Sequence, residues 1–109
     1  MDGVVDLLAL ARAADGIGPI WSLSSMDLNV NLIRFEGDAG VPAHVNEEVD
    51  VLVLAIEGEG TLELDGETQA LRAGQCCLIP RGATRAIRSA GRTFAYLTCH
   101  RRRAGLWPT

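Results

Sequence analysis

The sequence contains no lysine, because all ten of its basic side chains are arginine. A Schiff-base mechanism built on an active-site lysine is therefore excluded. Acidic residues are also missing from the last part of the chain, since all fourteen lie at or before Glu67 and residues 68–109 hold eight arginines and no acid. Apolar runs as long as the roughly 18 residues of a membrane-spanning helix are absent as well, so we expect no membrane partner.

An arginine-rich segment can indicate nucleic-acid binding. The formal net charge here is −4, which does not favour a polyanionic partner. In a rolled-up sheet, strands from both halves of a chain lie side by side, so acidic and basic strands can pair across the ladder. We therefore predict no nucleic-acid partner, and we expect Arg101, Arg102 and Arg103 to form a solvated tail or a contact between subunits.

Cysteine is scarce, and the three that are present are a poor basis for a disulfide framework. Cys76 and Cys77 are adjacent, and neighbours on a strand point to opposite faces, so they cannot both ligate one ion without distortion. We expect them and Cys99 to be small buried hydrophobic residues. The N-terminus carries Asp2 and Asp6 within its apolar stretch and lacks a basic start, which is unlike a secretory signal and predicts a cytoplasmic protein.

A chain of 109 residues has room for one core, so residues 1–109 are predicted to form a single domain. Residues 4–14 are rich in leucine and alanine and predict a short helix that ends at the turn of residues 15–19. The remaining pattern favours an antiparallel sandwich or barrel of about eight to ten short strands. We expect a loop at residues 37–42 and strands at residues 20–24, 28–36, 49–57, 61–65, 67–72, 75–79, 84–89 and 92–100.

Residues 49–57 are apolar on both faces, which predicts a buried central strand or a strand at a subunit interface. Asp65 and Gly66 are typical of a two-residue hairpin turn. Because a barrel of this size has a limited core, the two-sided apolar strand also predicts a homodimer. Trp21, Trp107 and the N-terminal helix are candidates for the contact.

One spacing is specific. Gly74 is followed by five residues, Pro80, one residue, Gly82, two residues and Arg85. This spacing resembles the second conserved motif of the cupin superfamily, particularly its small single-domain members, and the resemblance covers about residues 28–100. In that family a metal-binding histidine stands at the position of Arg85, and an asparagine at that of Ser89. The resemblance implies an all-β fold, an antiparallel double-stranded β-helix or jelly-roll barrel with the short N-terminal helix outside it.

The first motif of the family is matched more loosely. His44 fits its first histidine, Asn46 stands at the second, and the carboxylate position falls on Asp50 or Val51, depending on the spacing that is counted. A family site holds a transition metal with histidines and a carboxylate, whereas an arginine stays protonated and has no lone pair to donate. We therefore predict a degenerate site at His44, Asn46, Asp50 and Arg85, with no metal and no other cofactor.

An arginine that faces a barrel interior needs a counter-charge or a ligand. Arg85 can pair with Asp50, Glu48 or Glu47 and close the pocket, or its guanidinium can fork onto a carboxylate or phosphate of a small molecule. His44 can be a hydrogen-bonded structural residue or a general base. Both alternatives remain open for each residue.

Two functions are compatible with these residues. The preferred one is a metal-free cupin-like barrel that binds a small anionic organic ligand or acts as a dimeric non-catalytic module. The alternative is an enzyme, either a metal-dependent dioxygenase or isomerase or a metal-independent, epimerase-like protein. The latter would use His44 as base and Tyr96, the only tyrosine, as acid, although the strand of Tyr96 is expected to pack in the core. His100 is expected to have a structural or surface role.

Overall fold

The computed structural model describes residues 3–102 of the chain. A short helix precedes seven strands: α1 (Leu7–Ala13), β1 (Gly18–Ser24), β2 (Leu28–Glu36), β3 (Gly40–Val45), β4 (Val51–Leu64), β5 (Glu67–Arg72), β6 (Cys76–Ile79) and β7 (Thr84–Arg101). The strands pair antiparallel throughout residues 3–102. The predicted all-β jelly-roll barrel with a short N-terminal helix is therefore confirmed.

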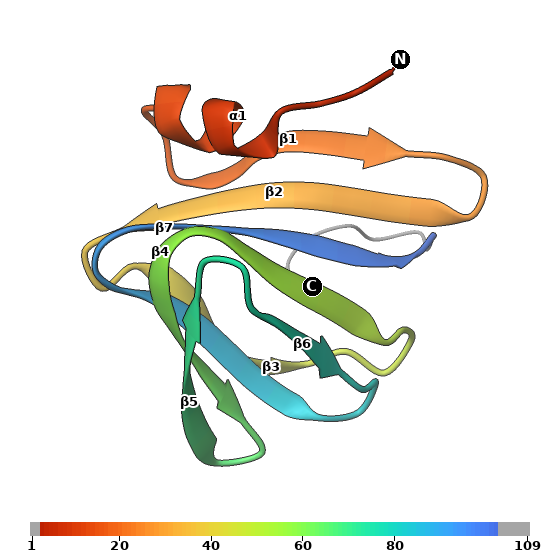
Figure 1. Cartoon of the computed structure of the whole chain (residues 1–109). Helices are drawn as coiled ribbons and strands as arrows, with labels where there is room; N and C mark the ends of the chain where they lie inside the picture. Colours follow the sequence, from red (N-terminus) through yellow and green to blue (C-terminus); the bar gives the residue numbers. More distant parts are fainter. Residues whose placement is uncertain (1–2, 103–109) are drawn as a thin grey trace.

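Two long strands, β4 and β7, bend and take part in both layers of the barrel (Figure 1). The first layer contains β1, β2, the second half of β7, the first half of β4, and β6. The second layer contains β3, the first half of β7, the second half of β4, and β5. We call the end where both strands bend the bend end, and the opposite end, with the loops of residues 46–50 and 80–83, the loop end.

Glycine makes the bend possible because there is no space for a side chain there. The β4 ladder is irregular between Ala55 and Gly60. A Cβ atom on Gly60 would lie 2.2 Å from the ring of the buried Phe94, and one on Gly58 would lie 2.0 Å from the carbonyl oxygen of Thr93. These glycines let β4 cross closely over β7 and change layers without leaving the sheet.

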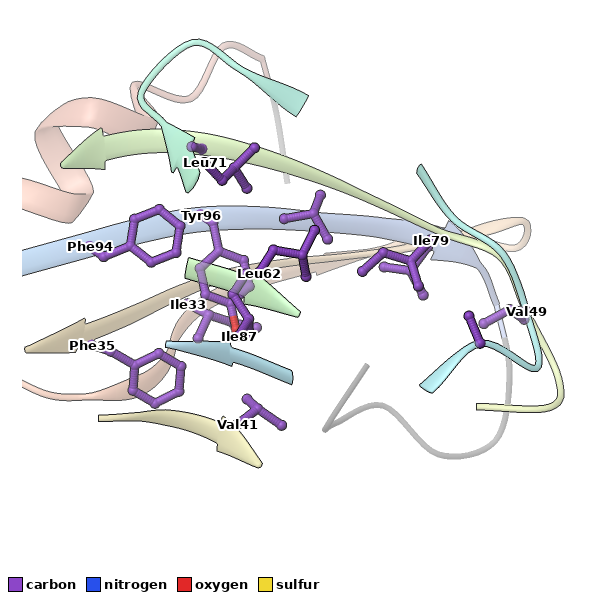
Figure 2. Packing of buried hydrophobic residues seen from close by; sticks show 14 residues of the cluster. Ile33, Phe35, Val41, Val49, Leu62, Leu71, Ile79, Ile87, Phe94 and Tyr96 are labelled. Atoms are coloured by element: carbon purple, nitrogen blue, oxygen red, sulfur yellow. The ribbon is translucent and has the colours of Figure 1, made fainter. Parts of the chain in front are cut away.

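The hydrophobic core lies between the two layers (Figure 2). The strand predicted for residues 28–36 is confirmed as β2, and its Ile33 and Phe35 are buried in this core together with Leu62. At the bend end Phe94 stacks on Tyr96, with 5.2 Å between the ring centroids.

The helix α1 packs outside the barrel, on the first layer. The Asp6 carboxylate accepts a hydrogen bond of 3.0 Å from the backbone N–H of Ala9 and caps the N-terminus. Ala11 packs against Leu32 and Ala95 on the outer face of the layer. The predicted helix is confirmed over a shorter range, and this helix, the only one in residues 3–102, is too short to span a membrane.

Three expectations about strands and cysteines need correction. The segment 37–42 is a loop only up to residue 39, because β3 begins at Gly40. The strands predicted as two pairs, 49–57 with 61–65 and 84–89 with 92–100, are the continuous bent strands β4 and β7. Bulges absorb the irregular residues, so the ladder continues past glycines that usually indicate turns.

The three cysteines are free thiols, but they are not uniformly buried. Cys76 is exposed on β6, and Cys77 and Cys99 are half-buried. Burial, with a smaller contribution from the neighbouring Cys76 thiol, raises the pKa of Cys77. A thiol with a raised pKa is a poor nucleophile near neutral pH, so Cys77 has no sign of a catalytic role.

Candidate functional site

The interior at the loop end holds His44 and Arg85, which are direct cross-strand partners of β3 and β7. Such partners share one face of the sheet. Together with Leu62, Tyr96 and Thr98 they line a cavity of about 20 Å³. A cavity of that size holds about one water molecule. The interior therefore has no space for an organic molecule in this conformation.

Arg85 is 2% exposed and binds the loop that leads into its own strand. Its Nε donates a hydrogen bond of 3.0 Å to the carbonyl oxygen of Ala83, and its Nη2 donates one of 3.1 Å to that of Pro80. Burial lowers the pKa of the guanidinium, and the Asp65 carboxylate acts in the opposite direction. A guanidinium nevertheless stays protonated in proteins, so Arg85 is a buried cation that stabilises the loop of residues 80–83.

His44 presents an accepting nitrogen to the interior. Its Nδ1 lies 3.0 Å from the carbonyl oxygen of Pro42, which assigns the ring proton to Nδ1 and leaves the lone pair on Nε2. That Nε2 atom is buried without a hydrogen-bond partner. The ring is thus oriented by the backbone, and its second nitrogen is available to a donor.

Asn46 lies in the adjacent loop and does not line the cavity. Its Oδ1 accepts hydrogen bonds from the backbone N–H groups of Glu48, at 2.9 Å, and Val49, at 3.3 Å. Both contacts stabilise the turn between β3 and β4. Its Nδ2 is buried without a partner.

The alternative between Asp50 and Val51 is decided by which residue faces inward. Val51 is fully buried, whereas Asp50 is exposed and its Oδ1 accepts a hydrogen bond of 2.8 Å from the backbone N–H of Arg81. Neighbouring residues point to opposite sides of a strand, so a valine occupies the position that faces the interior. The structure therefore brings His44 and Arg85 together and does not bring Asp50 to their cavity.

Four further polar residues lie buried at the loop end of the barrel: Asn29, Asn31, Thr98 and His100. Asn29 pairs with His100, and Asn31 with Thr98, across the β2–β7 ladder. His100 is therefore not a surface residue. Its Nδ1 lies 2.8 Å from the carbonyl oxygen of Arg101, and its Nε2, like the Nδ2 of Asn29, is buried without a partner. In the sequence, the period-two series Tyr96, Thr98 and His100 was the signal that His100 faces the interior together with the other two.

The metal that the cupin resemblance implies does not fit these residues. His44 offers one ring nitrogen, the Asn46 oxygen is engaged by two N–H groups, and Val51 offers no donor. Arg85 adds a positive charge beside the only imidazole of the cavity, and it would repel a cation. Within residues 3–102, no group of three or more His, Cys, Asp or Glu side chains is arranged to hold a metal ion.

The residues of a metal-independent, epimerase-like site are present, but their setting opposes the reaction. Tyr96 and His44 line the same small cavity. Burial raises the pKa of Tyr96 above its ordinary value. A tyrosine with a raised pKa is a weaker acid, and the cavity leaves no space for a substrate beside it.

Comparison with known proteins identifies the fold. A family model described as "Cupin domain" matches residues 31–100. The BH2720 protein of Bacillus halodurans is similar with a TM-score of 0.83 and 15% identity, over 100% of this chain and 87% of that one. The TT1209 protein of Thermus thermophilus is similar with a TM-score of 0.77 and 24% identity, over 93% and 98%. KdgF from Halomonas sp. is similar with a TM-score of 0.72 and 19% identity, over 77% of each chain.

These identities are too low to transfer an activity, and they show the fold alone. No curated protein matches the chain. The family model, however, covers more than half of the chain and coincides with the barrel from β2 to β7. The chain therefore belongs to the cupin-domain family.

Proposed function

We propose that this cupin domain is a metal-free, non-catalytic module that pairs with a second copy through the outer face of its first layer. The observation that carries the proposal is a row of apolar cross-strand neighbours on that face. The row contains one residue from each of the five strands: Leu23, Val30, Cys99, Leu52 and Leu78. Its charge-free composition is typical of a buried interface rather than of a solvated sheet.

A second apolar row runs beside the first and is partly covered by α1. It contains Trp21, Leu32, Leu97, Leu54 and Cys76, and the helix packs against several of these residues. The first row has no such cover among the described residues, since Leu52 is 41% and Leu78 is 58% exposed. Contiguous exposed apolar surface of this kind marks an interaction site.

A second copy is the occupant that best fits a flat face of this composition. In a two-fold dimer the same patch meets itself, so an apolar face is matched by an equally apolar one. Trp21 in the second row was an expected contact residue, whereas Trp107 and Arg103 lie outside the described residues. The three free thiols fit a reducing compartment, and we propose that the protein acts in the cytoplasm.

Light scattering after size-exclusion chromatography tests the pairing. We expect the wild type at micromolar concentration to have twice the 11.6 kDa mass of one chain. The double variant Leu52→Arg/Leu78→Arg should have the mass of one chain, because two charges would be buried at the interface. The matched control is Thr68→Arg, an exposed change on β5 in the second layer, which should remain dimeric. A monomeric wild type, or a double variant that still pairs, would show that this face is not the interface.

A small anionic ligand at the loop end is the second candidate function. The observation that favours it is the set of four buried side-chain nitrogens without partners, on Asn29, His44, Asn46 and His100, in a barrel that also buries the Arg85 cation. A small hydroxy acid would supply both donors and acceptors. Because the cavity is only about 20 Å³, entry requires the loop of residues 46–50 to move.

Titration with acetate, oxalate and inorganic phosphate, followed by NMR, tests this candidate. We expect saturable shifts of the His44 ring signals in the wild type, and weaker binding in an Asn46→Ala variant, which removes the Nδ2 donor. The control is Asn31→Ala, whose amide already contacts Thr98. Ring signals of His44 that stay unchanged with all three anions would exclude the candidate.

A further inference from the structure

A second polar depression lies at the bend end, away from the cavity of His44 and Arg85. It is an open groove of about 770 Å³ lined by residues of α1, the bends of β4 and β7, and the end of β5. We call it the bend-end groove. Four arginines from four different elements line it: Arg12 from α1, Arg34 from β2, Arg72 from β5 and Arg92 from β7.

Two of these arginines are paired with carboxylates of the bend. Arg12 Nε lies 2.8 Å from Glu57 Oε1, and Arg72 Nε lies 2.9 Å from Glu59 Oε1. Both arginine side chains are well exposed, at 65% and 63%. Exposed pairs of this kind contribute little free energy and can rearrange when a ligand approaches.

Arg34 differs because it is buried and only partly satisfied. The residue is 9% exposed. Its Nη1 donates to the carbonyl oxygen of Gly16 at 2.9 Å and lies 2.5 Å from Glu36 Oε2. Its Nε is buried without a partner. On burial this guanidinium lost its hydration, and no hydrogen bond to Nε compensates for that loss.

Arg92 supplies the surplus charge. Its side chain makes no hydrogen bond or ion pair with the rest of residues 3–102. Four arginines line the groove, and only three carboxylates contact them: Glu36, Glu57 and Glu59. The imbalance and the unused donors favour an anion in the groove.

We propose that the bend-end groove binds a small molecule through a carboxylate or phosphate group held by Arg34 and Arg92. Guanidinium groups bind both anions with paired N–H donors. The volume lies in the range of small-molecule sites. The groove is distinct from the apolar row of the first layer, so the proposal does not depend on dimer formation.

NMR titration of the ¹⁵N-labelled protein locates the binding. The probes are citrate for the carboxylate class and inorganic phosphate for the phosphate class, each compared with sodium chloride at the same ionic strength. We expect saturable shifts at the amides of Gly58, Ala73 and Thr93, which line the groove. The amide of Gly82, at the loop end, is the internal control and should not shift. The probe with the higher affinity identifies the class of ligand.

Two variants test the assignment of residues. Arg92→Gln should weaken binding at least about tenfold, because it removes a charge-assisted contact. Arg88→Gln is the matched control, since Arg88 is exposed on the same strand but outside the groove. Arg34→Lys keeps the charge but loses the Nε donor, and it should also weaken binding if the variant folds.

Three results would overturn the proposal. One is that sodium chloride produces the same shifts as both probes, which would indicate screening alone. Another is that the shifts lie at Gly82 and not in the groove. The third is that Arg92→Gln binds as tightly as Arg88→Gln. The monomeric Leu52→Arg/Leu78→Arg variant should bind the probes normally, so failure of the dimer and failure of the groove are separable.

Discussion

The buried phenol of Tyr96 predicts that the protein loses stability in alkali. The side chain is 2% exposed and stacked on Phe94, and burial raises its pKa above the ordinary value of 10.0. In the unfolded chain the phenol ionises near that value, whereas the native state keeps the proton. Above about pH 10 the unfolded state binds one proton fewer, so the free energy of unfolding falls by about 1.4 kcal/mol per pH unit. Because the unfolded phenol is half ionised at the start of this range, the loss between about pH 10 and pH 12 is about 2.3 kcal/mol.

The composition makes this loss measurable, because there is no lysine to titrate in the same range and Tyr96 is the only tyrosine. Cys77, whose pKa is also raised by burial, contributes in the same direction, and its contribution cancels when the wild type is compared with Tyr96→Phe. Urea unfolding at a fixed protein concentration should therefore show an alkaline slope that is steeper by one proton in the wild type.

Two results would refute the reasoning about Tyr96. One is native tyrosinate absorbance that appears near pH 10, and the other is an equal alkaline slope in the wild type and Tyr96→Phe. If the pKa of Tyr96 in the native state were below its ordinary value, the result would also support an enzyme that uses Tyr96 as an acid.

Two further predictions concern the loop end and the bend. Arg85→Met removes the donors to two carbonyl oxygens, so we expect urea unfolding to show a loss of about 3 kcal/mol, and Arg88→Met to change stability by less than about 0.5 kcal/mol. An unchanged Arg85→Met would mean that burial of the charge offsets its hydrogen bonds. Gly60→Ala should cost about 2 kcal/mol or more, because its Cβ would lie 2.2 Å from the buried ring of Phe94. Gly16→Ala, with nothing within 4 Å, should change the unfolding free energy by less than about 0.5 kcal/mol; equal costs would contradict the crowded bend.

Local signals in the sequence predict the elements that depend on local conformation. The Asp65–Gly66 turn is the clearest case, since both residues have positive φ, 49° and 87°, and Leu64 pairs with Glu67. The continuity of β4 and β7 was not predictable in this way. Whether a glycine ends a strand or bends it depends on the neighbouring strand, and the partners of Gly58 and Gly60 are Phe94 and Ser89, far along the chain.

The candidate site, like the fold, could be predicted from the sequence only in part. Motif spacing placed His44 and Arg85 at related positions, and the structure pairs them directly. The choice between Asp50 and Val51 required the phase of β4, because a shift of one residue exchanges the two faces of a strand. The alternation with Tyr96 and Thr98 indicates that His100 faces inward, but its position beside Asn29 depends on the β2–β7 register, which no local pattern determines. The size of the cavity depends on side-chain packing, so it could not be predicted from the sequence either.

The uneven distribution of charge along the chain becomes meaningful only in three dimensions. The prediction that acidic and basic strands pair across the ladder is confirmed at Glu59 and Arg72, which are direct partners of β4 and β5 and form an ion pair. Early acids and late arginines thus neutralise each other where strands from both parts meet. At the bend of β7, Arg92 follows the last acid of the chain by many residues and has no acidic neighbour on its own strand. Arg92, a late arginine without an ion pair among residues 3–102, lies in the bend-end groove beside Arg34, so the charge asymmetry contributes to the proposed anion site.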